Sequence, residues 1–110
     1  YDAALKLNPR HARAYMYRAL SLEEVGRGDE ALADLATALR LHPTGPDGYW
    51  HRGRLWATRD DHDRAVADFT WVLRLDPGNA AALNLRGVSH SERGDYAAAA
   101  ADFSEAVRLD

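Results

Sequence analysis

Apolar side chains recur at steps of three or four residues along most of the chain. One such run covers residues 12–24 and a second covers residues 31–39, and this spacing is typical of the buried face of an α-helix. Gly26 lies between the two runs and Pro43 follows the second, and both residue types commonly end helices. No useful stretch alternates with a period of two. The pattern therefore predicts pairs of helices joined by turns, and no strands.

The whole arrangement repeats every 34 residues. The matching positions hold these sets of residues: Pro9, Pro43 and Pro77; Ala31, Ala65 and Ala99; Leu35, Phe69 and Phe103; Ala38, Val72 and Ala106; Ala19, Gly53 and Gly87. A single helix pair leaves an apolar face open, so neighbouring pairs must stack. We therefore predict an all-α fold, a right-handed α-solenoid forming one domain over residues 1–110. Its three repeats cover residues 10–43, 44–77 and 78–110, and residues 1–9 form the second helix of a partial repeat before them.

Glycine occupies the middle of two of the predicted first helices, at Gly53 and Gly87. Glycine inside a helix costs about 1 kcal/mol relative to alanine, so we expect these positions to allow a close approach of the paired helix. Ala65 is the expected close neighbour of Gly53, and Phe69 is expected to fill the space beside this small pair. The third repeat has the same residue types at the same spacing.

The repeat resembles the tetratricopeptide repeat family. That family has a 34-residue helix-turn-helix period marked by an aromatic, a Leu-Gly pair, a Tyr, an Ala, a Phe and a Pro. The matching residues are Tyr49, Arg52-Gly53, Trp56, Ala65, Phe69 and Pro77 in the second repeat, and Leu83, Arg86-Gly87, His90, Ala99 and Phe103 in the third. The sequence departs from the pattern at Ala19, where glycine is usual, and at His90, where an aromatic is usual. The resemblance covers the whole chain and implies a module for protein–protein interaction.

A charged pair accompanies the small residue in each repeat. An arginine precedes the small residue of the first helix, and an aspartate precedes the large apolar residue of the second. Because the two helices run antiparallel, we expect three ion pairs, which are Arg18–Asp34, Arg52–Asp68 and Arg86–Asp102. Guanidinium and carboxylate groups can join through two parallel hydrogen bonds. We interpret the pairs as structural ties within each repeat, and the alternative is that they contact a ligand.

The first helices are expected to line a concave face, because stacked helix pairs curve into a solenoid. Residues that point away from the second helices are predicted to form a peptide-binding groove: Arg13, Met16, Tyr17, Leu20, Trp50, His51, Arg54, Asn84 and Val88. Aromatic and arginine side chains are enriched among the residues that dominate interface energies. We expect the groove to bind an extended peptide or a helix of a partner protein. For Met16, Tyr17 and Leu20, the alternative is packing against the preceding unit.

Many tetratricopeptide-repeat proteins hold the acidic tail of a chaperone with a clamp of Lys, Asn and Arg side chains. The matching places in this sequence hold Met16, Leu20, His51, Ala81 and Leu85. The resemblance therefore implies that this clamp is absent from these three repeats, which disfavours a chaperone tail as the ligand, and units outside this sequence could still carry one.

A second function remains open, that of a structural or self-assembly segment of a larger multi-repeat protein. We expect the apolar side of the last helix, including Ala100 and Val107, to be exposed, so homo-oligomers could form through the ends of the solenoid. Trp71 is predicted on the outer surface of a second helix. It either packs against the Leu83 side of the next repeat or marks a self-association patch.

The histidines and acidic residues form no recognisable metal or catalytic motif. No two of the histidines lie three or four apart on one helix, as a helical metal pair requires; they are His11, His42, His51, His62 and His90. The best metal candidate is Asp60-Asp61-His62-Asp63, for which capping of a helix N-terminus is the favoured interpretation. Since no Ser-His-Asp order or Gly-rich phosphate loop is present either, we expect no cofactor and no enzymatic activity.

The composition mainly serves to exclude classes of binding partner. The chain has 14 basic and 17 acidic side chains and a net charge of −3, whereas a nucleic-acid binder normally presents a basic face. It has no cysteine and no apolar run near the ~20 residues that a membrane helix needs. We therefore expect a protein or peptide partner, not nucleic acid or membrane. No signal peptide is apparent, which favours a cytoplasmic location, although Tyr1 in place of Met indicates an excerpt of a longer protein.

Overall fold

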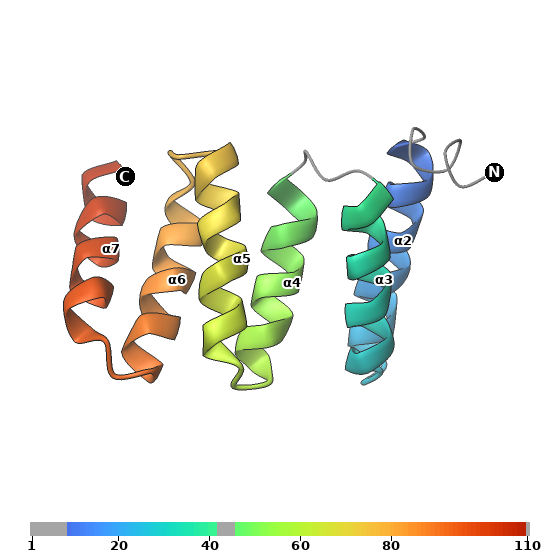
Figure 1. Ribbon diagram of the computed structural model, residues 1–110, viewed down its shortest axis with the longest axis horizontal. Coiled ribbons are helices and arrows are strands. Elements are labelled where there is room, and N and C mark those ends of the chain that lie inside the picture. Colours follow the sequence, from blue (N-terminus) through green and yellow to red (C-terminus); the bar gives the residue numbers. More distant parts are fainter. Residues whose placement is uncertain (1–8, 42–45, 110) are drawn as a thin grey trace. The chain divides into compact units, whose positions relative to one another are not determined.

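Six α-helices make up the part of the chain that the computed structural model describes, residues 9–41 and 46–109. They are α2 (Pro9–Glu24), α3 (Gly28–Leu41), α4 (Pro46–Thr58), α5 (His62–Leu75), α6 (Ala80–Glu92) and α7 (Tyr96–Leu109), shown in Figure 1. These residues contain no strand, so the predicted all-α helix-turn-helix fold is confirmed. The helix predicted at residues 1–9 lies outside the described part except for Pro9, which begins α2, and Pro43 lies outside it as well.

The chain divides into two compact units, Tyr1–Gly48 and Tyr49–Asp110. In the first unit α2 packs against α3 as an antiparallel hairpin (Figure 1). Ala19, Ala31 and Leu35 have no exposed surface and form the centre of this hairpin. A further cluster joins the two helices and consists of Ala12, Ala38 and Leu41 with the partly buried Tyr15 and Met16.

The second unit contains two helical hairpins. In this unit α6 packs against α7 and also against α5 of the preceding hairpin. The side chains of Phe69, Val72 and Ser89 are fully buried. Each hairpin therefore buries one face within itself, and the two hairpins bury a second face against each other, as expected for a repeat whose units stack.

The mid-helix glycines make room for phenylalanine rings. A Cβ atom added at Gly53 would lie 2.9 Å from Cε1 of Phe69, and one added at Gly87 would lie 2.8 Å from Cε1 of Phe103. The atoms nearest to each glycine thus belong to the ring and not to the alanine that the sequence analysis expected. In the first hairpin the same two positions hold Ala19 and the smaller Leu35, so a larger residue on one helix accompanies a smaller one on the other.

The turns within the three hairpins share one backbone conformation. Gly26, Asp60 and Gly94 are spaced 34 residues apart, and their φ angles are 81°, 61° and 84°. Glycine adopts this left-handed conformation without strain, whereas other L-residues pay a steric cost. After the second of these turns, the Asp61 carboxylate accepts a hydrogen bond of 3.3 Å from the Arg64 amide. This N-cap of α5 agrees with the capping interpretation of the acidic cluster.

Candidate functional site

The residues predicted to line a groove lie on α2, α4 and α6 with unequal exposure. On α2, Arg13 is exposed, Tyr17 is 59% exposed, and Leu20 is partly buried. Met16 packs against the cluster of Ala12, Ala38 and Leu41, so much of its side chain serves the first unit's core. In the second unit Trp50, His51 and Arg54 are partly buried on α4, whereas Asn84 and Val88 are exposed on α6.

Trp50 forms the centre of an aromatic and cationic group on α4. The guanidinium carbon of Arg54 lies 5.6 Å from the centroid of the indole ring, one helical turn away. The His51 ring meets the indole edge-on, with centroids 5.3 Å apart and an angle of 89°. A cation–π contact of this kind is worth roughly 0.5–1 kcal/mol at an exposed site. It holds the indole in one orientation while leaving part of its surface accessible.

A second tryptophan, Trp71, takes part in a stack on α5. Its ring lies 5.7 Å from that of Tyr49 at an angle of 20°, and the guanidinium of Arg74 lies 5.0 Å from its centroid. Arg52 lies 5.9 Å from the other ring, that of Tyr49. Trp71 is 45% exposed. It therefore lies on the outer surface, as the sequence predicts, and packs on Tyr49 of the first helix of its own repeat.

Each hairpin contains the arginine–aspartate pair that the sequence predicts. In every pair Nε and Nη2 of the arginine donate to the two carboxylate oxygens, at 2.7 Å for Arg18–Asp34, 2.9 Å for Arg52–Asp68 and 2.8 Å for Arg86–Asp102. The aspartate side chains are at most 9% exposed. The hydrogen bonds to Asp68 raise the pKa of Arg52 above its ordinary value, although burial opposes this effect. A buried carboxylate with two charge-assisted hydrogen bonds is already satisfied, which favours the structural role.

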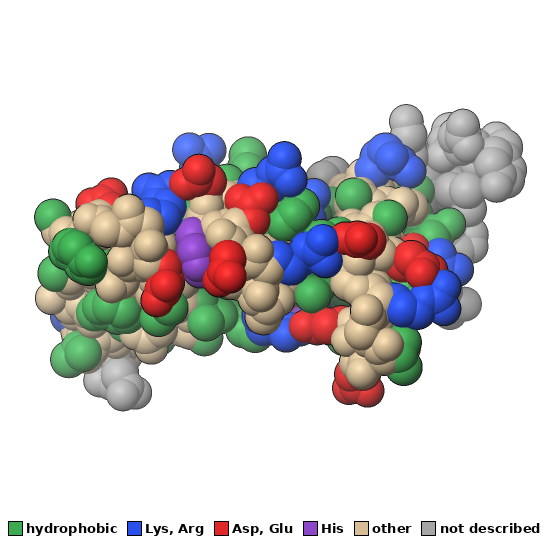
Figure 2. Space-filling view, turned by 90° about the horizontal axis from the view of Figure 1, so that it is seen from below, with side chains coloured by type: hydrophobic (Ala, Val, Ile, Leu, Met, Phe, Trp, Pro, Cys, Tyr) green, Lys and Arg blue, Asp and Glu red, His purple; other side chains and the backbone are tan. Residues whose placement is uncertain are grey.

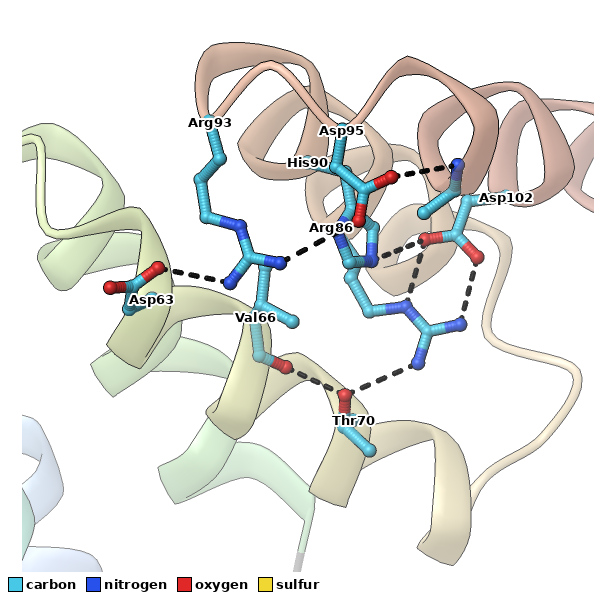
Figure 3. A network of polar contacts seen from close by, with 9 residues as sticks. Asp63, Val66, Thr70, Arg86, His90, Arg93, Asp95 and Asp102 are labelled. Atoms are coloured by element: carbon cyan, nitrogen blue, oxygen red, sulfur yellow. Dashed lines mark hydrogen bonds and ion pairs between the residues drawn. The ribbon is translucent and has the colours of Figure 1, made fainter.

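The pair in the third hairpin is also connected to the second hairpin. Nη1 of Arg86 donates to Oγ1 of Thr70 at 3.2 Å, and Oγ1 of Thr70 donates to the carbonyl oxygen of Val66 at 2.7 Å. Figure 3 shows this arginine between Asp102 on one side and Thr70 on the other. His90 Nε2 lies 3.7 Å from the same Asp102 carboxylate. Arg86 thus joins α5, α6 and α7 through one planar group.

The turns at one end of the second unit form an open, polar depression of about 480 Å³. Figure 2 shows acidic, basic and histidine side chains mixed over this end of α4–α7. Arg93 crosses it to donate a 3.0 Å hydrogen bond to Asp63 (Figure 3). Among the residues that line the depression are both acidic and basic side chains, and Arg93 and Asp63 form an ion pair. Within residues 9–41 and 46–109 no group of three metal-binding side chains converges.

Asp60 and His62 line this depression, and the His62 ring also contacts Ser89. The two imidazole nitrogens of His62 lie 3.3 Å from the Ser89 hydroxyl and 3.6 Å from an Asp60 oxygen. The order resembles a hydrolytic triad, but Ser89 is completely buried between α5 and α6. A nucleophile must be reachable by its substrate, so the chemistry of this group is that of a structural hydrogen bond. The sequence analysis missed it because Ser89 lies 27 residues from His62.

The comparisons with known proteins agree with this architecture. A family model described as Tetratricopeptide repeat matches residues 1–46, 18–69 and 52–110. The comparison with curated proteins finds no match. Among the helices described in Figure 1, none is long and apolar enough to cross a membrane.

Several solved structures are similar to this chain. The first tetratricopeptide domain of Spaghetti (RPAP3), bound to an HSP90 peptide, has a TM-score of 0.90 at 16% identity, covering 96% of this chain and 84% of that one. The MamA protein has a TM-score of 0.87 at 20% identity, with 93% and 56% covered. The N-terminal domain of stress-induced protein-1 from C. elegans has a TM-score of 0.86 at 13% identity, with 92% and 85% covered. The chain thus spans little more than half the length of MamA, and at these identities the likeness is one of fold.

Proposed function

This chain belongs to the tetratricopeptide repeat family, and we propose that it is a protein-interaction module that binds an extended peptide or helix of a partner on its first helices. The proposal rests on the partial exposure of the Trp50 side chain. This large aromatic side chain is only partly buried, and Arg54 fixes its orientation. The core of the same hairpin closes without it, through Leu55, Ala65 and Phe69.

The neighbouring first helix adds accessible surface of a similar kind. Val88 on α6 is 47% exposed, and Asn84 on the same helix is exposed. An aliphatic side chain can contribute buried apolar area on binding, at about 25 cal/mol per Å². An amide side chain can donate to or accept from a peptide backbone. A peptide with an apolar or aromatic side chain for Trp50 is the ligand that these residues favour.

An acidic chaperone tail is a weaker candidate. The Spaghetti (RPAP3) domain with the same fold holds the HSP90 peptide SRMEEVD, which has three acidic groups besides any terminal carboxylate. On α4 and α6 of this chain, the places matched to the clamp hold His51, Ala81 and Leu85. These side chains supply no lysine or asparagine. We therefore propose that binding rests on apolar contact, with Arg54 contributing a single cation.

The proposal is tested by selecting ligands from a random-peptide phage library and measuring binding of a labelled synthetic peptide by fluorescence anisotropy. The variant Trp50→Ala/Arg54→Ala should weaken binding about 10-fold or more, because interface tryptophan and arginine side chains often contribute over 1 kcal/mol each. The matched control is Trp71→Ala/Arg74→Ala, which removes the same residue types in the same kind of contact from α5. This control should bind the peptide like the native chain.

Both double variants are compared at a temperature where circular dichroism shows each to be fully folded. Native-like binding by Trp50→Ala/Arg54→Ala would contradict the proposal, and so would an equal loss in the control. Failure of the native chain to retain any peptide through selection would also count against it.

A further inference from the structure

His90 lies between two carboxylates of the third hairpin. Its side chain, in the last turn of α6, is 12% exposed. Nε2 of the ring lies 3.7 Å from Oδ2 of Asp102 on α7, and Nδ1 lies 4.0 Å from Oδ2 of Asp95 in the turn before α7 (Figure 3). An ionised carboxylate can only accept hydrogen bonds. Both ring nitrogens therefore face an acceptor.

A neutral imidazole cannot satisfy both of these contacts. It carries a single N–H, so its other nitrogen presents a lone pair to a carboxylate. Nδ1 of His90 is buried and makes no hydrogen bond within the part of the chain that the structure describes. An imidazolium carries two N–H groups and can donate to Asp102 and Asp95 at once. The acceptors around His90 thus fit the doubly protonated ring.

The charges around the ring favour the same form. Arg86 binds Asp102, and Arg93 lies 3.0 Å from Asp63 of α5 and 3.8 Å from Asp95. Three carboxylates against two guanidinium groups leave one negative charge in this network, which an imidazolium neutralises. Burial disfavours a charge on the ring, whereas nearby carboxylates favour it. The network therefore offsets the cost of burying the second ring proton.

The neighbouring groups show that this arrangement belongs to His90 alone. The matching positions of the first two repeats hold Leu22 and Trp56, which carry no charge. Helix α5 also presents His62 to α6, but the ring of His62 lies 3.3 Å from the Ser89 hydroxyl and 3.6 Å from Asp60. A hydroxyl can donate as well as accept, so a neutral His62 satisfies its contacts. A change of charge at His90 acts on the third hairpin.

We propose that His90 makes the contact between α6 and α7 sensitive to pH. Histidine gains its second ring proton between about pH 8 and pH 5. The protonated ring donates to Asp102 and Asp95 together and joins the last turn of α6 to the middle of α7 and to the turn between them. Loss of that proton removes one of the two donors. The added stability is thus present at mildly acidic pH and is lost as the pH rises through the titration of His90.

An NMR titration of the chain with isotope-labelled histidine tests the protonation of the ring. Ring nitrogen shifts distinguish a protonated nitrogen from a bare one, and His90→Gln identifies the signals of His90. At about pH 5.5 both nitrogens should be protonated. Asp95→Asn should move the midpoint to lower pH, while the asparagine still caps α7 as Asp95 does at the Ala98 amide. Asp63→Asn, the control, should move it less, because Asp63 pairs with Arg93 and not with the ring.

Native-state hydrogen exchange measures the effect on α6 and α7. After correction for the intrinsic pH dependence of exchange, opening of these helices should be about 5-fold rarer at about pH 5.5 than at about pH 8. His90→Phe restores the aromatic that is usual at this position and should abolish most of the difference. Asp95→Asn should reduce it without changing the size of a buried side chain. His62→Gln, the matched control, should retain it.

Three results would overturn the proposal. The first is a His90 ring that stays neutral at about pH 5.5. The second is a titration midpoint that Asp95→Asn and Asp63→Asn move equally. The third is a pH response of hydrogen exchange that is the same in the native chain as in His90→Phe and Asp95→Asn, because other groups would then be its cause. Circular dichroism confirms that each variant is folded.

Discussion

Arg86 donates two hydrogen bonds of 2.8 Å to Asp102 and a third of 3.2 Å to Thr70 on the preceding hairpin. The first two join α6 to α7 and the third joins α6 to α5. Lysine could not replace this group, because an ammonium lacks the planar array of donors that matches a carboxylate. One arginine thus sets the register within a repeat and between two repeats.

Removing this arginine should destabilise the second unit. In Arg86→Ala the Asp102 carboxylate, 8% exposed, loses both of its strong donors. Leaving a buried charged acceptor unsatisfied costs about 2 kcal/mol, so the urea midpoint should fall with little change in the slope of the transition. The double variant Arg86→Ala/Asp102→Ala should lose less than the two single variants together. Additive losses in this double-mutant cycle would show that the two side chains do not act as a pair.

The first hairpin offers a comparison within the same chain. Arg18 makes the same two bonds to Asp34, but its side chain is far more exposed than that of Arg86. Water reaches such an exposed pair easily and, when the arginine is removed, can replace part of its hydrogen bonding to the carboxylate. Arg18→Ala should therefore lower stability less than Arg86→Ala. The reverse order would contradict the role given to burial and to the third bond.

The glycine–phenylalanine contact predicts that the effect of Gly53→Ala on stability depends on the residue at position 69 and changes sign when that residue is leucine. Gly53→Ala should lower stability by about 1 kcal/mol, because the new methyl group overlaps Phe69 and the resulting strain exceeds the gain in helix propensity. In a Phe69→Leu background the same substitution should raise stability, because the pair then matches Ala19 and Leu35. Thermal unfolding of the four chains measures both effects. A loss of similar size in both backgrounds would mean that the ring is not what excludes a side chain.

The features that lie within one repeat could be predicted from the sequence. The helix period places Arg52 and Asp68 on facing sides of an antiparallel hairpin, and the 34-residue spacing gives the same relation three times. The sequence also indicates the backbone conformation of the turn at Asp60, because the matching positions of the preceding and following repeats hold Gly26 and Gly94. A left-handed conformation at Asp60 follows from that register alone.

The features that join one repeat to the next could not be predicted in the same way. The bond from Arg86 to Thr70 depends on how far α6 is rotated against α5, which the period of either helix leaves open. Only one of the second helices carries threonine at this position. The contact therefore does not recur every 34 residues and leaves no repeating pattern in the sequence. The partner of the Trp71 ring could not be predicted for a similar reason. Its ring turns toward Tyr49 of its own repeat, and ring orientation is set by local packing and not by spacing.

The left-handed turns predict that introducing glycine at one turn and removing it from another change stability in opposite directions. Asp60→Gly should stabilise the chain by about 0.5–1 kcal/mol, because it relieves the steric cost of a φ of 61° at a residue with a Cβ atom. Gly94→Ala should destabilise it by about 1 kcal/mol for the converse reason. No atom lies within 4 Å of a Cβ built at Gly94, so this loss is not a packing effect. Thermal melts of the two variants check the prediction, and an unchanged melting temperature in both would contradict it.

The ion pair between Glu105 and Arg108 predicts a local pH dependence. Hydrogen bonds from Arg108 lower the pKa of the Glu105 carboxyl below its ordinary value. The pair therefore stabilises the end of α7 above the ordinary glutamate pKa, and that contribution disappears as the pH falls through the lowered value. An NMR titration of the Glu105 carboxyl carbon should show the low midpoint in the native chain. In Arg108→Gln the midpoint should move up, and an unmoved midpoint would rule out Arg108 as the cause.

The most direct test of the account is to locate a bound peptide on the first helices. A peptide selected from the phage library is added to isotope-labelled protein, and changes in amide chemical shifts are mapped onto the sequence. We predict that the largest changes occur on α4 and α6, around Trp50, Arg54 and Val88. Changes centred instead on α5 around Trp71, or on α7, would contradict the proposal that the first helices hold the partner.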